Sequence, residues 1–174
     1  MKKLLVLFIL LFAVQISAQQ PSANSKKRPP AVADASQIVN RKITRFLEKQ
    51  PGYTRAADNI WTIPYKGKSL TDFEVMVVTS EGGELVIFAV VIAKSKEMRP
   101  NHDLLYTILK YNNLADHVKA GINDEGDLFV RADISGRLMD LPQFQSILAQ
   151  VAAASDGLHG EIVSLLAPTA PVSK

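Results

Sequence analysis

The densest group of carboxylates in the chain consists of Asp124, Glu125 and Asp127, with Asn123 beside them. Oxygen ligands at this density could hold Ca²⁺. Calcium usually takes about six to eight oxygens, however, and the group falls short of that number and lacks the long loop of an EF-hand. Asn and Gly tolerate the left-handed backbone of tight turns, and Gly126 lies within the group. The sequence therefore favours a polar hairpin turn here over a calcium site.

Three histidines could take part in zinc or acid–base chemistry. His102, His117 and His159 are widely spaced and the chain has no cysteine, so a zinc site would have to be assembled by folding from histidines and carboxylates. Asp133 and Asp140 could act as acid and base only if the fold brought them together, and Asp140 is also placed to cap a helix. We interpret the histidines as surface or helix-end residues, and we expect no metal site and no cofactor.

The sequence carries none of the short motifs that mark the common enzyme classes. It has no Gly-x-Ser-x-Gly turn, no Ser-x-x-Lys pair, no glycine-rich phosphate loop, no dinucleotide fingerprint and no His-Glu-x-x-His pair. The sequence therefore predicts no catalytic residues and a protein that is not an enzyme.

Aromatic side chains could form a binding site, because exposed rings are common anchors at protein interfaces. Trp61, Tyr65 and Phe73 fall on adjacent predicted strands. They are core residues if they face the helices, and they form an apolar groove for a partner if part of the sheet is open. Tyr106 and Tyr111 flank the apolar stripe of a predicted helix and are candidates for a surface of self-association.

Apolar periodicity predicts the elements that position these residues. We expect a helix at 36–50, strands at 61–65, 73–77 and 85–93, a helix after Pro100 and Asn101, strands at 118–122 and 128–132, and a long final helix from Asp140 that Gly157 and Gly160 could bend or break. The strand with Pro64 is expected near a sheet edge, because proline cannot donate a ladder hydrogen bond. The fold class is α+β: a two-layer sandwich with an antiparallel five-stranded sheet and three helices in the order α-β-β-β-α-β-β-α.

The two ends of the chain differ from its middle. Residues 1–18 contain two lysines, an apolar run from Leu4 to Val14 and a small residue at Ala18, which together are typical of a secretory signal peptide. The run is shorter than the roughly 20 residues that cross a bilayer, so we expect cleavage and no stable membrane anchor; the alternative is that the segment is retained uncleaved as an anchor. We predict a flexible linker at 19–33, one domain at 34–167 and a flexible tail at 168–174, in a protein that is periplasmic or secreted.

Charge argues against nucleic acid as a partner. The chain carries a net charge of +3, with 20 Lys and Arg against 17 Asp and Glu. Six of the basic residues lie outside 34–167, which leaves 14 against 17 and a domain charge of −3. The predicted domain is mildly acidic and has no basic stripe.

Several stretches together resemble the YbjN-like family, which is similar in fold to type III secretion chaperones. They are WTIPYKGKSLTDFEVMVV, the apolar third strand, DLLYTILKYNN and NDEGDLFVRADIS, and they include Trp61, Gly67, Asn112 and Gly126. The resemblance covers nearly all of 34–167. It implies a non-enzymatic protein-binding scaffold, often dimeric, with no catalytic or metal-binding residues.

Two functions follow as expectations. The first is an exported, non-catalytic module, chaperone-like or regulatory, that binds an unidentified protein and forms a homodimer. The alternative is a periplasmic carrier that holds a small apolar ligand between the sheet and the helices, suggested by the continuously apolar strand at 85–93.

Overall fold

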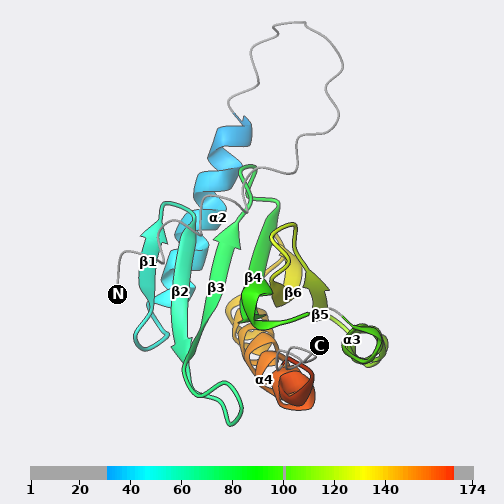
Figure 1. Ribbon diagram of the computed structural model, residues 1–174. Helices are drawn as coiled ribbons and strands as arrows, with labels where there is room; N and C mark the ends of the chain where they lie inside the picture. The colour runs from blue at the N-terminus through cyan, green and yellow to red at the C-terminus, as the bar shows by residue number, and fades with distance from the viewer. Residues whose placement is uncertain (1–30, 100, 167–174) are drawn as a thin grey trace, which may run out of the picture.

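Among the residues that the structure describes, six antiparallel strands form a sheet and three α-helices pack against it (Figure 1). The computed structural model describes residues 31–99 and 101–166. The predicted signal peptide 1–18, the tail 168–174 and all but the last three residues of the predicted linker lie outside the described residues. The arrangement confirms the α+β class.

The strands follow the order β1-β2-β3-β4-β6-β5 across the sheet. They are β1 (Thr54–Ala57), β2 (Ile60–Tyr65), β3 (Phe73–Thr79), β4 (Leu85–Ala93), β5 (Lys119–Ile122) and β6 (Leu128–Ser135). The helices, labelled as in Figure 1, are α2 (Ala31–Leu47), α3 (His102–Leu114) and α4 (Leu141–Leu166), and a short 3-10 turn covers Ser95–Glu97.

The predicted count of five strands was wrong, because the sheet has a sixth strand, β1. Its sequence is Thr-Arg-Ala-Ala and all four of its side chains are exposed. Neither face of β1 enters the core, so the strand has no apolar alternation to detect. It is defined by pairing with β2, where Arg55 lies opposite Trp61. Periodicity carries no signal for a strand of this kind.

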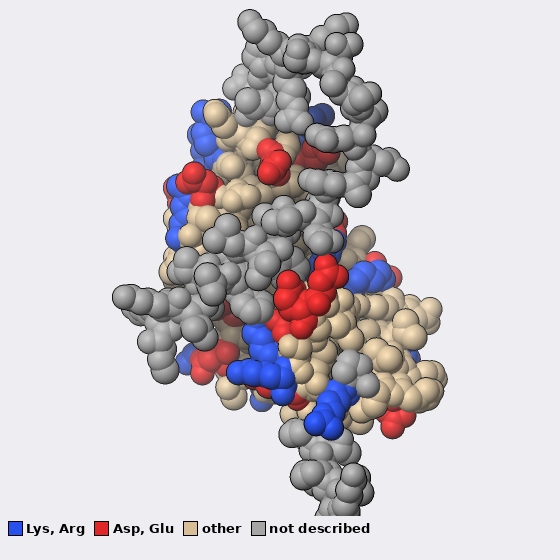
Figure 2. Space-filling view, turned by 45° about the horizontal axis from the view of Figure 1, so that its top comes forward, with Lys and Arg blue, Asp and Glu red and all other residues tan. Residues whose placement is uncertain are grey.

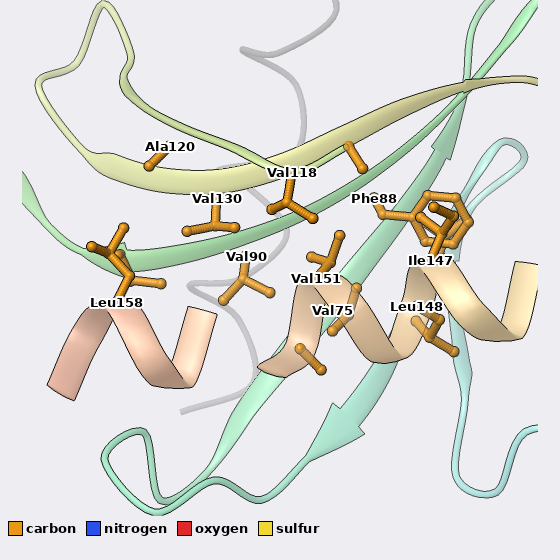
Figure 3. Packing of buried hydrophobic residues seen from close by; sticks show 14 of the residues in the cluster. Val75, Phe88, Val90, Val118, Ala120, Val130, Ile147, Leu148, Val151 and Leu158 are labelled. Carbon is orange, nitrogen blue, oxygen red and sulfur yellow. The ribbon is translucent and has the colours of Figure 1, made fainter. Parts of the chain in front are cut away.

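One face of the sheet packs on the helices and forms the core. Across the strands Trp61 lies opposite Val77, and Val77 lies opposite Phe88; all three are fully buried. Phe144 of α4 contacts Phe88 and also Phe46 of α2, with ring centroids 5.3 and 5.6 Å apart. Figure 3 shows from close by buried side chains of the same core, among them Ile147 and Val151 of α4 and Phe88 of β4. Each large buried side chain contributes about 1.5–3 kcal/mol, so the contacts on this face hold the sheet and the helices together.

The ends of two helices are set by side-chain caps. The Asn101 carboxamide oxygen accepts a hydrogen bond from the Leu104 amide at 2.9 Å, and the Asp140 carboxylate accepts one from the Gln143 amide at 2.8 Å. Both caps pair amides that have no partner within the helix. They place the starts of α3 and α4 where the sequence predicted them.

Helix α4 runs without interruption through Gly157 and Gly160, where a bend or break was considered. Glycine costs a helix about 1 kcal/mol relative to alanine. Leu158 and Ile162, which lie close to these positions, are fully buried, and their burial offsets that cost.

None of the helices in the described ranges combines the length and apolarity that a membrane crossing requires.

Candidate functional site

The three aromatic residues proposed for partner binding do not share one environment. Trp61 is fully buried in the core, which is the alternative that the sequence left open, and its ring is closed to a partner in this conformation. Tyr65 and Phe73 lie opposite each other at the joined ends of β2 and β3. Both are partly buried, and their rings stack with centroids 5.9 Å apart and planes inclined by 27°.

Tyr65 and Phe73 line an open groove of about 620 Å³, which we call the β2–β3 groove. Two prolines and a glycine complete its apolar lining, and three charged residues border it. The full lining is Pro51, Gly52, Pro64, Tyr65, Lys66, Asp72, Phe73 and Glu74. Burial raises the pKa of the Tyr65 hydroxyl above its usual value of 10.0, so this ring stays neutral. The groove can receive an apolar side chain flanked by polar groups.

Local backbone chemistry explains why a groove forms at this place. The pairing of β1 with β2 ends at Thr54 opposite Thr62. Two residues further along β2 lies Pro64, which has no amide hydrogen to donate. Gly52 then turns with a φ of +74°, and a side chain added there would lie 3.1 Å from the Pro64 ring. The pairing of the two strands therefore stops short of the end of β2. Pro64 was expected on a strand near a sheet edge; β2 is second from the edge.

The loop at residues 66–72, which joins β2 to β3, is attached to α4. The Asp156 carboxylate accepts hydrogen bonds from the amides of Lys68 at 3.0 Å and of Ser69 and Leu70 at 2.8 Å. The Ser69 hydroxyl also lies 2.6 Å from Nδ1 of His159. The amide bonds from Lys68, Leu70 and Ser69, together with His159, hold the pKa of Asp156 below its usual value.

This attachment was not predicted from the sequence. His159 was interpreted as a surface or helix-end residue, and Asp156 was not singled out. The partners are 86 to 90 residues apart, and no local pattern connects a helix carboxylate to the amides of a distant loop. Only the identity of Gly67 hinted at a close approach, because a side chain there would lie 2.2 Å from Asp156 Oδ1.

Helix α3 carries the two tyrosines proposed for self-association. Tyr106 is 62% exposed and stands beside exposed Leu105 and Leu109; we call these three residues the α3 apolar face. Tyr111 instead turns inward and is partly buried, and burial together with nearby Glu161 raises the pKa of its hydroxyl. Figure 2 shows few charged side chains on the side of the molecule where α3 lies.

Three of the five carboxylates weighed for calcium or acid–base chemistry have structural partners. Asp127 is buried and accepts hydrogen bonds from the Ser95 amide at 2.8 Å and from Lys94 Nζ at 3.1 Å. Asp133 pairs with Arg131, and Asp140 caps α4. Within residues 31–99 and 101–166 no group of three or more His, Asp or Glu is arranged to hold a metal ion. The turn at Asn123–Gly126 is the hairpin turn that the sequence favoured, closed by a 2.9 Å backbone bond.

The space between sheet and helices is filled by side chains. Trp61, Phe88 and Phe144 are fully buried there, whereas the β2–β3 groove lies at the ends of two strands. Nothing in the described residues favours a carrier that holds a small ligand between the layers.

Comparison with solved structures places the protein in the fold class shared by YbjN and type III secretion chaperones, as the sequence resemblance predicted. The structure is similar to a chain of the HopA1–SchA chaperone–effector complex, with a TM-score of 0.54 and 14% identity over 76% of this chain and 99% of that one. It is similar to a chain of the ExsC–ExsE complex, at 0.52 and 13% over 78% and 98%. It is also similar to YbjN from E. coli, at 0.52 and 16% over 71% and 90%. At these identities the likeness is one of fold. No family model and no curated protein matches the sequence.

Proposed function

We propose that the protein is an exported, non-catalytic protein-binding module, chaperone-like or regulatory, that holds an extended segment of a partner. The stacked pair of Tyr65 and Phe73 carries the proposal, because it lines an open groove large enough for apolar side chains. Two of the chains that share the fold come from complexes between two proteins. The signal-like residues 1–18 support export.

The edges of the sheet suggest how an extended segment would bind. Strand β5 is closed on its outer side, because Asn112 of α3 donates to the Ala120 carbonyl at 2.9 Å and accepts from the Ala120 amide at 2.7 Å. Strand β1 is the opposite edge and exposes all its side chains. Gly52 of the groove lies two residues before β1. A segment that pairs with β1 would therefore end at the groove, so that main-chain bonds supply affinity and the groove supplies selectivity.

Selection of a peptide and measurement of its affinity test the proposal. A displayed peptide library is selected against the full chain, and the affinity of the selected peptide is measured by calorimetry. We expect Phe73→Ala to weaken binding about 30-fold, as for a buried aromatic anchor. Leu138→Ala is the matched control, because Leu138 is apolar, 82% exposed and absent from the groove lining. Failure to select any peptide, or equal binding by Phe73→Ala, contradicts the proposal.

The protein also self-associates, we propose, through the α3 apolar face. A monomer gains little from exposing three large apolar side chains on one helix face, and their burial against a second copy removes them from water. Tyr106 is the aromatic residue of this face. The groove is lined by residues of other elements, so both surfaces can be used at once.

A further inference from the structure

The two ends of one loop, which has few internal hydrogen bonds, line the β2–β3 groove. Lys66 and Asp72, the first and last residues of the 66–72 loop, line the groove beside Tyr65 and Phe73. Within the loop one backbone bond, from the Gly67 amide to the Leu70 carbonyl at 2.8 Å, closes a turn. A loop of this length with a single internal bond loses much conformational entropy when it is fixed, so other contacts must hold it.

The hydrogen bonds that hold the backbone of the loop from outside come from one carboxylate on α4, while the Ser69 hydroxyl contacts His159 and the Leu70 side chain packs against the core. Asp156 Oδ1 accepts from the Ser69 and Leu70 amides, and Oδ2 accepts from the Lys68 amide, so three successive amides converge on one side chain. Hydrogen bonds to an ionised acceptor are shorter and stronger than neutral ones. The fit is close, since a Cβ at Gly67 would lie 2.2 Å from Asp156 Oδ1 and 2.8 Å from the Leu70 carbonyl oxygen. The loop therefore has one arrangement that satisfies both partners.

The helix that supplies Asp156 is itself fixed by the core. Ser155 and Leu158, on either side of Asp156, are fully buried, and Ser155 donates to the Val151 carbonyl at 2.7 Å. The carboxylate is thus presented by a rigid element, which is the condition for holding a binding surface in one shape.

We propose that Asp156 is a positioning residue that holds the 66–72 loop as a wall of the β2–β3 groove and so keeps the groove preformed for a partner. This inference rests on the proposed function for its purpose. A preformed groove binds more tightly than a loop that must be ordered on binding, because the ordering entropy is lost before the partner arrives.

Nuclear magnetic resonance of the full chain tests the inference without any partner. In Asp156→Asn, which keeps the side-chain size and removes the charge, we expect hydrogen exchange at the amides of residues 68–70 to be about tenfold faster or more. We also expect weaker contacts between the Tyr65 and Phe73 rings in nuclear Overhauser spectra. Asp116→Asn, the same change at an exposed carboxylate, is expected to leave both readouts unchanged. Ser69→Ala removes only the contact with His159 and is expected to stay close to the parent.

Two results overturn the inference. Unchanged exchange at residues 68–70 would show that Asp156 does not hold the loop, and faster exchange with unchanged ring contacts would show that the groove does not depend on it. If Asp156→Asn does not fold, Gly67→Ala breaks the same contact from the loop side and is judged by the same readouts. Because no ligand is used, the absence of any selected peptide would count against the proposed function alone.

Discussion

Trp61 was a candidate for partner binding because of its residue type, but it is a core residue. Its side chain is fully buried, and its indole N–H has no hydrogen-bond partner among the described residues. A buried donor without a partner costs about 1–3 kcal/mol. What the ring contributes at this position is its volume, which is packed in the core between β2 and the helices.

Substitution of Trp61 should consequently act on stability. We expect Trp61→Ala to lower the free energy of unfolding by about 3–5 kcal/mol through the cavity that it leaves. Trp61→Phe keeps most of the ring and removes the unpaired N–H, so its loss should be much smaller. Urea unfolding followed by circular dichroism measures both. A stable Trp61→Ala protein that fails only to bind a peptide would mean that this ring contacts the partner.

The carboxyl group of Asp156 should make the attachment of the 66–72 loop sensitive to acid. Backbone hydrogen bonds from Lys68, Leu70 and Ser69 lower its pKa from the usual 3.8, and His159 on the same helix acts in the same direction. A carboxyl group whose pKa is lower in the folded state stabilises that state above its unfolded pKa and loses the contribution as the pH falls through its folded pKa. The attachment of the loop is therefore intact at neutral pH and is lost as the pH falls through the lowered pKa of Asp156.

Amide chemical shifts of residues 68–70, followed from pH 6 downwards in steps, measure this loss. They should titrate with a midpoint below the usual aspartate value of 3.8, and Asp156→Asn should abolish the transition. A midpoint above 3.8 would contradict the assignment of the carboxylate as the acceptor of these amides.

At the scale of elements, the two edge strands of the sheet differ in how far their outer backbone groups are covered. Asn112 of α3 pairs with both backbone groups of Ala120 and so occupies the outer edge of β5. Strand β1 ends the other side of the sheet and exposes its side chains; among the described residues, the one backbone group of β1 that a side chain is seen to occupy is the Ala57 carbonyl, which accepts from the Arg55 guanidinium at 3.2 Å. An edge that remains open invites pairing with another chain, and only the β1 edge lies next to the groove.

The closure of β5 can be tested by removing its side chain. Asn112→Ala leaves both backbone groups of Ala120 unpaired and should lower the free energy of unfolding by about 1–3 kcal/mol. Asn113→Ala, at the adjacent exposed position, should change it by less than about 0.5 kcal/mol. Urea unfolding of the pair gives both values. Equal stability of the two variants would show that Asn112 does not hold the edge.

The elements differ in how much of them the sequence could predict. Strands β2 to β6 and all three helices bury an apolar face, so their periodicity revealed them. Strand β1 buries nothing and escaped notice. Tyr65 and Phe73 were predicted as candidates from ring type and strand position. The burial of Trp61 could not be predicted in the same way, because it depends on which face of β2 meets the helices. The contact of Asp156 with residues 68–70 could not be predicted, because it exists only when α4 lies against the loop.

At the scale of the whole molecule, the groove and the α3 apolar face lie on different elements, which permits a dimer with two binding sites. The proposed self-association predicts a measurable change of mass. Leu109→Glu places a charge in the middle of the α3 apolar face, where it would be costly to bury, and should convert a dimer to a monomer in sedimentation equilibrium. Glu161→Gln, an exposed change on α4, is the control and should leave the mass unchanged. A monomeric parent chain would contradict self-association.

The central claim is that the protein binds a partner segment through the β2–β3 groove. Chemical-shift mapping tests it most directly, with the selected peptide titrated into the isotope-labelled full chain. The account predicts that the largest shifts fall on Gly52, Tyr65 and Phe73, with smaller shifts along β1. Shifts concentrated on α3, or no shifts at a peptide excess that saturates binding, would contradict it.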